Sequence, residues 1–185
     1  MSATIVETEA YYRKEKGSHA SLGRTPSREA LWAPPGTIYM YYSRGKDSLN
    51  VSCQGDGNAV LIKAGEPACT GRALAAMHGL NPAAGGGSRE RVRLCAGQTL
   101  LARALALRVV DWNGRPFDDA QFCLVDTRYV PSALIQTTRL GIPSGRDQDL
   151  PYRFVDYEHA TAATQNPLRK RGWREGYEYR LQLNP

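Results

Sequence analysis

The sequence predicts a mixed α+β fold in a single domain, with a mainly antiparallel sheet. The chain has 185 residues, 42% of them hydrophobic, which suits one domain with its own core and leaves too little chain for two full-sized domains. Three strand-like segments between residues 37 and 64 follow one another almost without a helix. The Gly-Asp-Gly sequence at residues 55–57 is typical of a tight hairpin turn, so the strands beside it should pair antiparallel.

The first half of the chain contains runs of β-branched and aromatic residues that are bounded by turn residues. These runs predict strands at Thr4–Tyr12, Thr37–Tyr42, Leu49–Cys53 and Ala59–Ala64. Between the first two strands, residues 17–32 mix Ser, Gly, Arg and Pro, and the Pro-Pro-Gly sequence at residues 34–36 predicts a turn. Helical composition predicts two helices, at Gly71–Gly79 and Thr99–Leu107.

The second half of the chain has weaker patterns. We expect a strand at Phe122–Val125, a helix at Ala133–Arg139 and a strand at Tyr152–Tyr157. Residues 159–185 form a basic and aromatic tail, densest at Asn166–Arg180. The sequence leaves its role open between an edge element of the sheet, an arm that contacts phosphate and a loosely held terminus.

The charge of the chain favours a polyanionic partner. Lys and Arg number 24 against 18 Asp and Glu, a formal net charge of +6, and the isoelectric point is about 9.3. Most of the basic residues are arginines, whose planar guanidinium suits phosphate and stacks on bases. Nucleic acid is therefore a candidate partner, although a basic solvated surface explains the charge equally well.

The cysteines and histidines predict no metal site. The four cysteines and three histidines are scattered, and no two cysteines have Cys-x-x-Cys spacing. The first residues lack the pattern of a secretory signal, and no stretch approaches the roughly 18 apolar residues of a membrane span. We therefore expect reduced cysteines, no metal site, no membrane span, and a cytoplasmic protein that would be nucleoid-associated in a bacterium.

Two carboxylates occur on one face of the first predicted strand. Strand alternation places Glu7, Glu9 and Tyr11 on the same side, with the Cα atoms of the two glutamates about 6.5–7 Å apart. Such a pair could provide the acid and base of a hydrolase that cleaves glycosidic bonds. The alternative is an exposed strand face with no catalytic role.

Tyrosines are concentrated on two predicted strands, at positions 11, 12, 39, 41 and 42. If Tyr11 and Tyr41 face one cavity, they could hold a planar base by stacking, worth about 1–3 kcal/mol per base. The electron-rich rings would also attract a cationic base more than a neutral one. A carboxylate between aromatic walls in a basic protein therefore suggests hydrolysis at a nucleobase or its sugar.

Six short segments in order resemble the 3-methyladenine (alkyladenine) DNA glycosylase family. They are Ile5-Val-Glu-Thr-Glu-Ala-Tyr11, Ser18-His-Ala20, Gly23-Arg-Thr-Pro26, Pro35-Gly-Thr-Ile-Tyr-Met-Tyr41, Leu49-Asn-Val51 and Gly57-Asn-Ala-Val-Leu-Ile-Lys63. Weaker matches return at Leu94-Cys-Ala-Gly97, in residues 102–105, at Arg139-Leu-Gly-Ile142 and at Leu150-Pro-Tyr-Arg-Phe154. The resemblance is dense over residues 4–67.

The resemblance implies both a fold and a reaction. Members of the family are compact single domains with a curved, largely antiparallel sheet flanked by helices, similar to the C-terminal domain of methionyl-tRNA formyltransferase. They are monofunctional enzymes of base-excision repair that bind double-stranded DNA, flip a damaged purine into a pocket and hydrolyse its N-glycosidic bond without a metal or cofactor. We accordingly expect a monomer that leaves an abasic site, or alternatively a catalytically impaired nucleic-acid-binding module of the same fold.

The family's functional residues match particular positions of this chain. By resemblance, Glu9 is the catalytic residue that deprotonates the attacking water, and Tyr11 stacks on the flipped base. The resemblance implies that His19 and Tyr41 form the opposite wall of the pocket. It also implies that Asn50 crowds the amino group of guanine. Lys63 is expected to help hold the water and the glutamate. Arg44 is expected to fill the gap left by the flipped nucleotide, and Arg24 and Arg28 to contact DNA. Glu7 and His19 are the candidates for a general acid that neutral lesions would require.

The chain departs from the family pattern at four places. Lys63 replaces a common arginine, which keeps the charge and loses the bidentate fork, so we expect the water to be held more loosely or by a different arrangement. Arg44 replaces an inserted tyrosine. The family's Gly-Pro-Gly-Lys turn is replaced by Gly97-Gln98-Thr99-Leu100. The chain also lacks the usual N-terminal segment before the catalytic strand, which we expect to affect stability more than chemistry.

Overall fold

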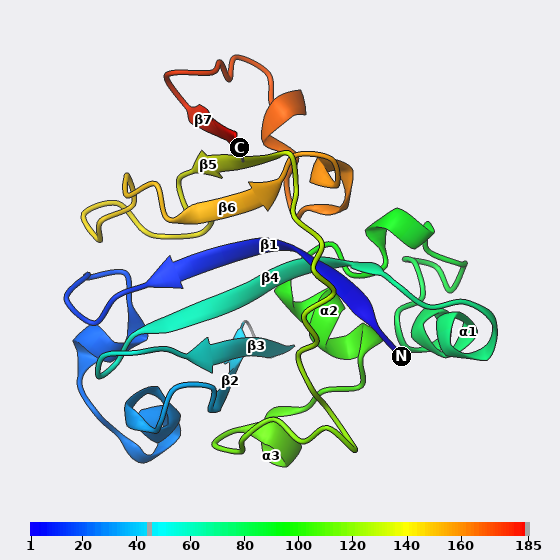
Figure 1. Ribbon diagram of the computed structural model, residues 1–185, viewed down its shortest axis with the longest axis horizontal. Helices are drawn as coiled ribbons and strands as arrows, with labels where there is room; N and C mark the ends of the chain where they lie inside the picture. Colours follow the sequence, from blue (N-terminus) through cyan, green and yellow to red (C-terminus); the bar gives the residue numbers. More distant parts are fainter. Residues whose placement is uncertain (44–45, 184–185) are drawn as a thin grey trace.

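The computed structural model describes residues 1–43 and 46–183 and has one mixed α/β domain built on a seven-stranded sheet. The strand order is β2-β3-β4-β1-β6-β5-β7, and all the neighbouring pairs that it describes are antiparallel (Figure 1). The strands are β1 Ala3–Tyr11, β2 Ile38–Ser43, β3 Lys46–Ser52, β4 Ala59–Pro67, β5 Ala133–Thr137, β6 Arg153–Asp156 and β7 Tyr179–Leu183.

The first strand of the chain is also the central strand of the sheet. β1 pairs with β4 on one side and with β6 on the other, so that Glu9 lies opposite Leu61 of β4 and Arg153 of β6. The register with β4 shifts on both sides of Glu7, which marks a bulge in the strand. A strand paired on both edges holds its side chains in fixed positions, which suits a residue with a precise chemical task.

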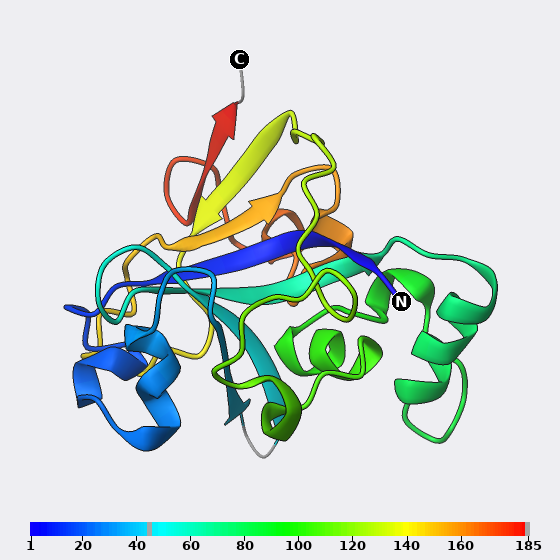
Figure 2. The ribbon, with the colours of Figure 1, turned by 60° about the horizontal axis from the view of Figure 1, so that its bottom comes forward.

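Three α-helices lie together on one side of the sheet, coloured green in Figure 2. They are α1 Gly71–Leu80, α2 Gln98–Ala104 and α3 Val109–Trp112. Five 3₁₀ helices complete the described elements: η1 His19–Leu22, η2 Pro26–Trp32, η3 Arg91–Arg93, η4 Ala160–Ala162 and η5 Pro167–Arg169. No helix in residues 1–43 and 46–183 has the length and apolar character needed to cross a membrane.

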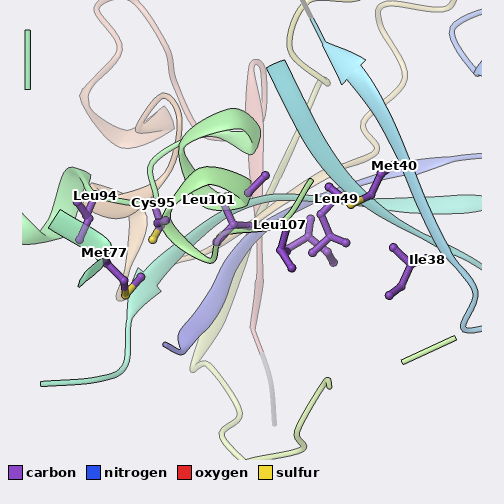
Figure 3. Packing of buried hydrophobic residues seen from close by; sticks show 11 residues of the cluster. Ile38, Met40, Leu49, Met77, Leu94, Cys95, Leu101 and Leu107 are labelled. Atoms are coloured by element: carbon purple, nitrogen blue, oxygen red, sulfur yellow. The ribbon is translucent and has the colours of Figure 1, made fainter. Parts of the chain in front are cut away.

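The largest apolar cluster fixes α2 against the sheet (Figure 3). Leu101 and Ala102 of α2 and Leu49 of β3 are all at most 2% exposed, and the helix packs on both β3 and β4. Burial of each large apolar side chain contributes about 1.5–3 kcal/mol, so this contact stabilises the position of the helix strongly. Its first residue, Gln98, is thereby held between Ser43 at the end of β2 and Lys63 in the middle of β4.

The elements of the first half agree with the sequence predictions. The four predicted strands, the two predicted helices and the antiparallel pairing of β3 with β4 are confirmed, with bounds that differ by a few residues. The predicted strand at residues 152–157 is confirmed as β6. The mixed fold in a single domain with an antiparallel sheet is thus as expected.

Two predictions in the second half are wrong. Residues 133–137 form strand β5 instead of a helix, and their side chains alternate between buried and half-buried, the period of a strand. Residues 122–125 form no strand. Val125 is 73% exposed, and Phe122 makes an isolated bridge with Asp118. The Phe122 ring packs on Trp112. An apolar run without a neighbouring strand edge has no ladder to join.

The end of the basic tail is an edge strand. β7 pairs with β5, and its half-buried Tyr179 and Leu181 pack on the cluster around Ile135 and Val155. Before it, Lys170 lies over the ring of Trp173 at 3.9 Å and Arg174 over the ring of Tyr177 at 4.4 Å. The edge-element alternative therefore describes residues 179–183, and contact of the preceding segment with phosphate stays a prediction.

Candidate active site

A cavity of about 820 Å³ opens where the sheet, the 3₁₀ helix η1 and the start of α2 meet. This volume is within the range of small-molecule binding sites. Its polar and aromatic lining includes Tyr11, His19, Tyr39, Tyr41, Asn50 and Lys63. The structure therefore brings together all four residues that the sequence predicts to bind substrate, together with Lys63.

Glu9 lies directly behind the wall of this cavity. Its side chain is fully buried. Glu9 Oε2 accepts a hydrogen bond from the Tyr11 hydroxyl at 2.7 Å, and Oε1 accepts one from the backbone N–H of Leu140 at 2.9 Å. The Lys63 ammonium lies 3.3 Å from Oε1 and 3.4 Å from Oε2. Tyr11, Lys63 and Leu140 all line the cavity. Each residue that donates to the Glu9 carboxylate therefore lies between that carboxylate and the cavity.

Tyr11 forms one side of the cavity and is itself tightly held. Arg139, whose side chain is fully buried, places its guanidinium 4.5 Å from the centre of the Tyr11 ring and forms an ion pair with Glu15. Burial, followed by the negative charge of Glu9, raises the pKa of the Tyr11 hydroxyl well above its usual range. The hydroxyl therefore keeps its proton and remains a donor to Glu9.

Three rings form another wall of the cavity. His19 Nδ1 lies 2.8 Å from the Tyr39 hydroxyl, and the centres of the His19 and Tyr41 rings are 4.4 Å apart. Tyr39 and Tyr41 stack with an interplanar angle of 29°. Burial, then the positive charges of Arg28 and Arg146, lowers the pKa of His19 from its usual 6.5, so its ring is neutral at pH 7.

Asn50 lies in this wall and is 5% exposed. Its Nδ2 donates a hydrogen bond to the backbone carbonyl of Tyr39 at 3.1 Å, across the β2–β3 pair. This bond fixes which end of the amide faces the strand. The side chain therefore has a defined orientation at the cavity. A defined orientation is what the predicted steric exclusion of guanine would need.

Glu7 is buried, so the interpretation of an exposed strand face is wrong. Glu7 Oε1 accepts a hydrogen bond from Arg153 Nε at 2.6 Å, and Oε2 accepts one from the backbone N–H of Thr164 at 2.7 Å. Arg153 and Glu7 side chains are both fully buried. These partners give Glu7 a structural task, which argues against a hydrolase that uses Glu7 and Glu9 as an acid and base pair.

The predicted DNA-contacting arginines lie in different surroundings. Arg24 forms a bidentate ion pair with Glu29, and its guanidinium lies 5.9 Å from the Trp32 ring. Arg28 Nη1 donates to the carbonyl groups of Leu22 and Gly23, at 3.1 Å each. Arg44 lies outside the described residues.

Gln98 and the backbone of Leu140 are parts of the site that sequence reasoning did not assign. Gln98 Oε1 accepts a hydrogen bond from Lys63 Nζ at 3.3 Å, and Gln98 Nε2 donates one to Ser43 Oγ at 2.5 Å. The only signals were the departure from the family turn at residues 97–100 and the weak family match at residues 139–142. A backbone N–H carries no signal in the residue type, since every residue but proline has one.

Among the residues that the structure describes, no three His, Cys, Asp or Glu side chains gather as a metal site. The four cysteines are free. The cavity has a set of aromatic faces, and behind its wall lies the Glu9 carboxylate with three surrounding donors. That arrangement can orient a water molecule and hold a flat ring.

Comparisons with known proteins agree with the resemblance of the motifs. Residues 1–160 match the family model described as methylpurine-DNA glycosylase. A protein of Pseudomonas savastanoi pv. phaseolicola named "Putative 3-methyladenine DNA glycosylase" is 55% identical over 97% of this chain and 82% of its own length. A protein with the same name from Pseudomonas fluorescens is 56% identical over 98% of this chain and 80% of its own length. Another, from Rhodopseudomonas palustris, is 35% identical over 81% of this chain and 68% of its own length.

Proposed function

The chain belongs to the methylpurine-DNA glycosylase family, and from this premise we propose that it is a monofunctional enzyme of base-excision repair. It extrudes an alkylated purine from duplex DNA into the cavity and hydrolyses the N-glycosidic bond. The product is an abasic site in an intact strand. Membership of the family by itself indicates a DNA glycosylase for alkylated bases.

The observation that carries the proposal is the set of donors around Glu9. Its carboxylate is bound by the Tyr11 hydroxyl, the Lys63 ammonium and the Leu140 N–H, and all three residues line the cavity. A buried carboxylate is costly unless its charge is compensated in this way. A water molecule that reaches Glu9 past Lys63 and Tyr11 would be held by a base that is fixed in place.

In the proposed reaction the bond between C1′ and the purine nitrogen breaks first, and the electron pair leaves with the purine. The sugar acquires oxocarbenium-like charge, which the negative charge of Glu9 stabilises. Water then adds to C1′ and gives a proton to Glu9. A purine alkylated at N3 or N7 is cationic, so it departs as a neutral base and needs no proton.

The walls of the cavity support selection for such cationic bases. Tyr11 and Tyr41 present electron-rich faces, and cation–π attraction contributes about 0.5–2 kcal/mol. The neutral ring of His19 adds no opposing charge at pH 7. Asn50, fixed on the Tyr39 carbonyl, would crowd the amino group of guanine. We therefore expect faster excision of 3-methyladenine than of neutral lesions such as hypoxanthine.

The proposal extends to the fold and to the setting of the reaction. We propose that the sheet corresponds to the curved sheet of the methionyl-tRNA formyltransferase C-terminal domain. We also propose that the protein acts as a monomer on double-stranded DNA in the cytoplasm or nucleoid. Arg24, Arg28 and Arg44 are proposed to contact that duplex.

The deciding experiment compares the chain with its Glu9→Gln variant on a duplex that carries one alkylated purine. Glu90→Gln is the matched control, because Glu90 is exposed and does not line the cavity. The parent chain and the control should yield abasic sites, and Glu9→Gln should yield at least 100-fold fewer, in the range of general-base contributions. If the parent is inactive and still binds the duplex, the protein is an impaired binding module of the same fold.

A further inference from the structure

The Lys63 ammonium has three acceptors arranged around it. Nζ lies 3.3 Å from Glu9 Oε1, 3.4 Å from Glu9 Oε2 and 3.3 Å from Gln98 Oε1. An ammonium has three N–H donors that rotate freely and no planar fork. Its place over a carboxylate is therefore decided by the acceptors on its other sides, and here the acceptor outside the carboxylate is the amide of Gln98.

Gln98 can accept this bond in one orientation only. Its Nε2 donates to Ser43 Oγ at 2.5 Å, while its Oε1 faces the ammonium. Since an ammonium can only donate, turning the amide over would place N–H groups against the Lys63 charge and break the bond to Lys63. The amide is thus locked between the end of β2 and Lys63 on β4.

The backbone also fixes Gln98. It is the first residue of α2, whose Leu101 and Ala102 are buried against β3 and β4. The preceding Gly97 has φ of +133°, a conformation that favours glycine, and it turns the chain into the helix beside the cavity. Ser43, Gln98 and Lys63 all line that cavity.

We propose, resting on the function proposed above, that Gln98 is a positioning residue for the Lys63–Glu9 pair. It holds the ammonium centred over both carboxylate oxygens. Without Gln98, Lys63 moves toward one oxygen or toward the cavity, and the approach of water to Glu9 is no longer defined. The chain Ser43–Gln98–Lys63–Glu9 thereby supplies the directional restraint that a lysine lacks.

The first test is the Gln98→Leu variant, which keeps much of the side-chain volume and removes both amide bonds. Its single-turnover excision rate should fall roughly 10- to 100-fold, because small misplacements of catalytic groups cost this much. Its affinity for the lesion duplex should fall by less than the rate does, since the stacking rings of Tyr11 and Tyr41 remain in the cavity. Gln54→Leu is the matched control, as Gln54 is exposed and does not line the cavity.

A second measurement distinguishes positioning from general damage to the fold. In the Lys63→Arg background the guanidinium fork can hold the carboxylate without help, so Gln98→Leu should reduce the rate by less than about twofold. An equal loss in both backgrounds would show that Gln98 acts through another contact and would overturn the proposal.

A third readout does not depend on activity. The ¹⁵Nζ resonance of Lys63, assigned by its disappearance in Lys63→Arg, should be sharp in the parent chain and should shift or broaden in Gln98→Leu, but not in Gln54→Leu. An unchanged resonance would overturn the proposal even if excision slowed. If the parent chain excises nothing and the resonance still responds to Gln98, the proposed function fails while the positioning role stands.

Discussion

Tyr11 contributes two groups to the site that can be separated by a single substitution. Its hydroxyl donates to Glu9 Oε2 at 2.7 Å, and the residue also lines the cavity beside the Arg139 guanidinium. A hydrogen bond to a charged group contributes about 1.5–3 kcal/mol. Under the proposed function, we expect the hydroxyl to act on the chemistry at Glu9 and the ring to bind the base.

Tyr11→Phe should accordingly lower the single-turnover excision rate by roughly 10-fold or more, the equivalent of losing one charge-assisted bond. Binding of the lesion duplex should change little, because the ring remains. Tyr11→Leu should weaken binding as well, through loss of stacking. Weaker binding with an unchanged chemical rate in Tyr11→Phe would contradict this division of roles.

His19 makes stability depend on pH in a known direction. Burial, followed by Arg28 and Arg146, lowers its pKa in the folded protein below the usual 6.5. As pH falls through 6.5, the unfolded chain takes up a proton on this residue more readily than the folded one. The contribution of His19 to stability is therefore present above pH 6.5 and is lost progressively below it.

Replacing the residue tests this linkage. The difference in unfolding free energy between the parent chain and His19→Gln, measured by urea denaturation, should decrease between pH 7.5 and pH 5.5. His78→Gln provides the comparison at a half-buried histidine outside the cavity. A difference for His19→Gln that stays constant with pH would rule out the lowered pKa.

Residues with distinctive chemistry could be predicted from the sequence, and their supports could not. Glu9, Tyr11 and Asn50 belong to short motifs. Tyr11 and Asn50 line one cavity, and Glu9 lies behind its wall, bound to the Tyr11 hydroxyl. Gln98 attracted notice only as a departure from a family turn, because an amide at a helix start has many ordinary explanations. The Leu140 N–H could not be predicted, since only the folded loop brings it within 2.9 Å of Glu9 Oε1.

At the scale of elements, a buried ion pair joins β1, β6 and the loop that follows β6. Glu7 of β1 binds Arg153 of β6, Arg153 Nη2 donates to the carbonyl of Gln165 at 2.6 Å, and the Thr164 N–H donates to Glu7. Thr164 and Gln165 line the cavity. The pair therefore holds a part of the cavity wall in place from behind.

Glu7→Gln should destabilise the protein by about 3–5 kcal/mol, because it leaves the buried Arg153 charge without its partner. Urea denaturation would measure the loss. The double variant Glu7→Leu with Arg153→Met removes both charges and should cost less than the sum of the two single variants. Additive losses would mean that the pair does not act as a unit.

The strands show where local sequence decides the structure and where it does not. β1 to β4 carry β-branched and aromatic runs with clear turn residues between them, and were predictable. The sequence of β5, Ala-Leu-Ile-Gln-Thr, fits a helix as well as a strand. Pairing with β6 on one side and β7 on the other decides for the strand, and neither pairing can be predicted from the five residues of β5 alone.

At the scale of the whole molecule, the site exists only after distant parts of the chain have met. Glu9 is bound by Lys63 and Leu140, which are 54 and 131 residues away in sequence. The central place of β1 makes this possible, because β4 and β6 flank it (Figure 1). Loss of the sheet would therefore abolish the contacts of Glu9 and the pocket together.

The chain has a formal net charge of +6, and part of its positive charge is concentrated in one exposed segment of the tail. Arg169, Lys170 and Arg171 are consecutive and exposed, and they follow closely after Thr164 and Gln165 at the cavity. If a duplex places one base in the cavity, as proposed, its backbone extends beyond the rim, and we expect it to pass near this segment. We expect these side chains to bind phosphates and release counterions.

Changing all three to Gln should make the logarithm of the binding constant less dependent on the logarithm of the salt concentration. The slope should fall by roughly 0.9 for each phosphate that these side chains no longer neutralise, or about 2–3 in total. A control with the same reduction of charge, made at the exposed Arg72, Arg115 and Arg128, separates local binding from general attraction. Equal slopes for the two triple variants would mean that the tail only adds to the overall charge, and a smaller slope for the tail variant alone would identify it as a phosphate-contacting arm.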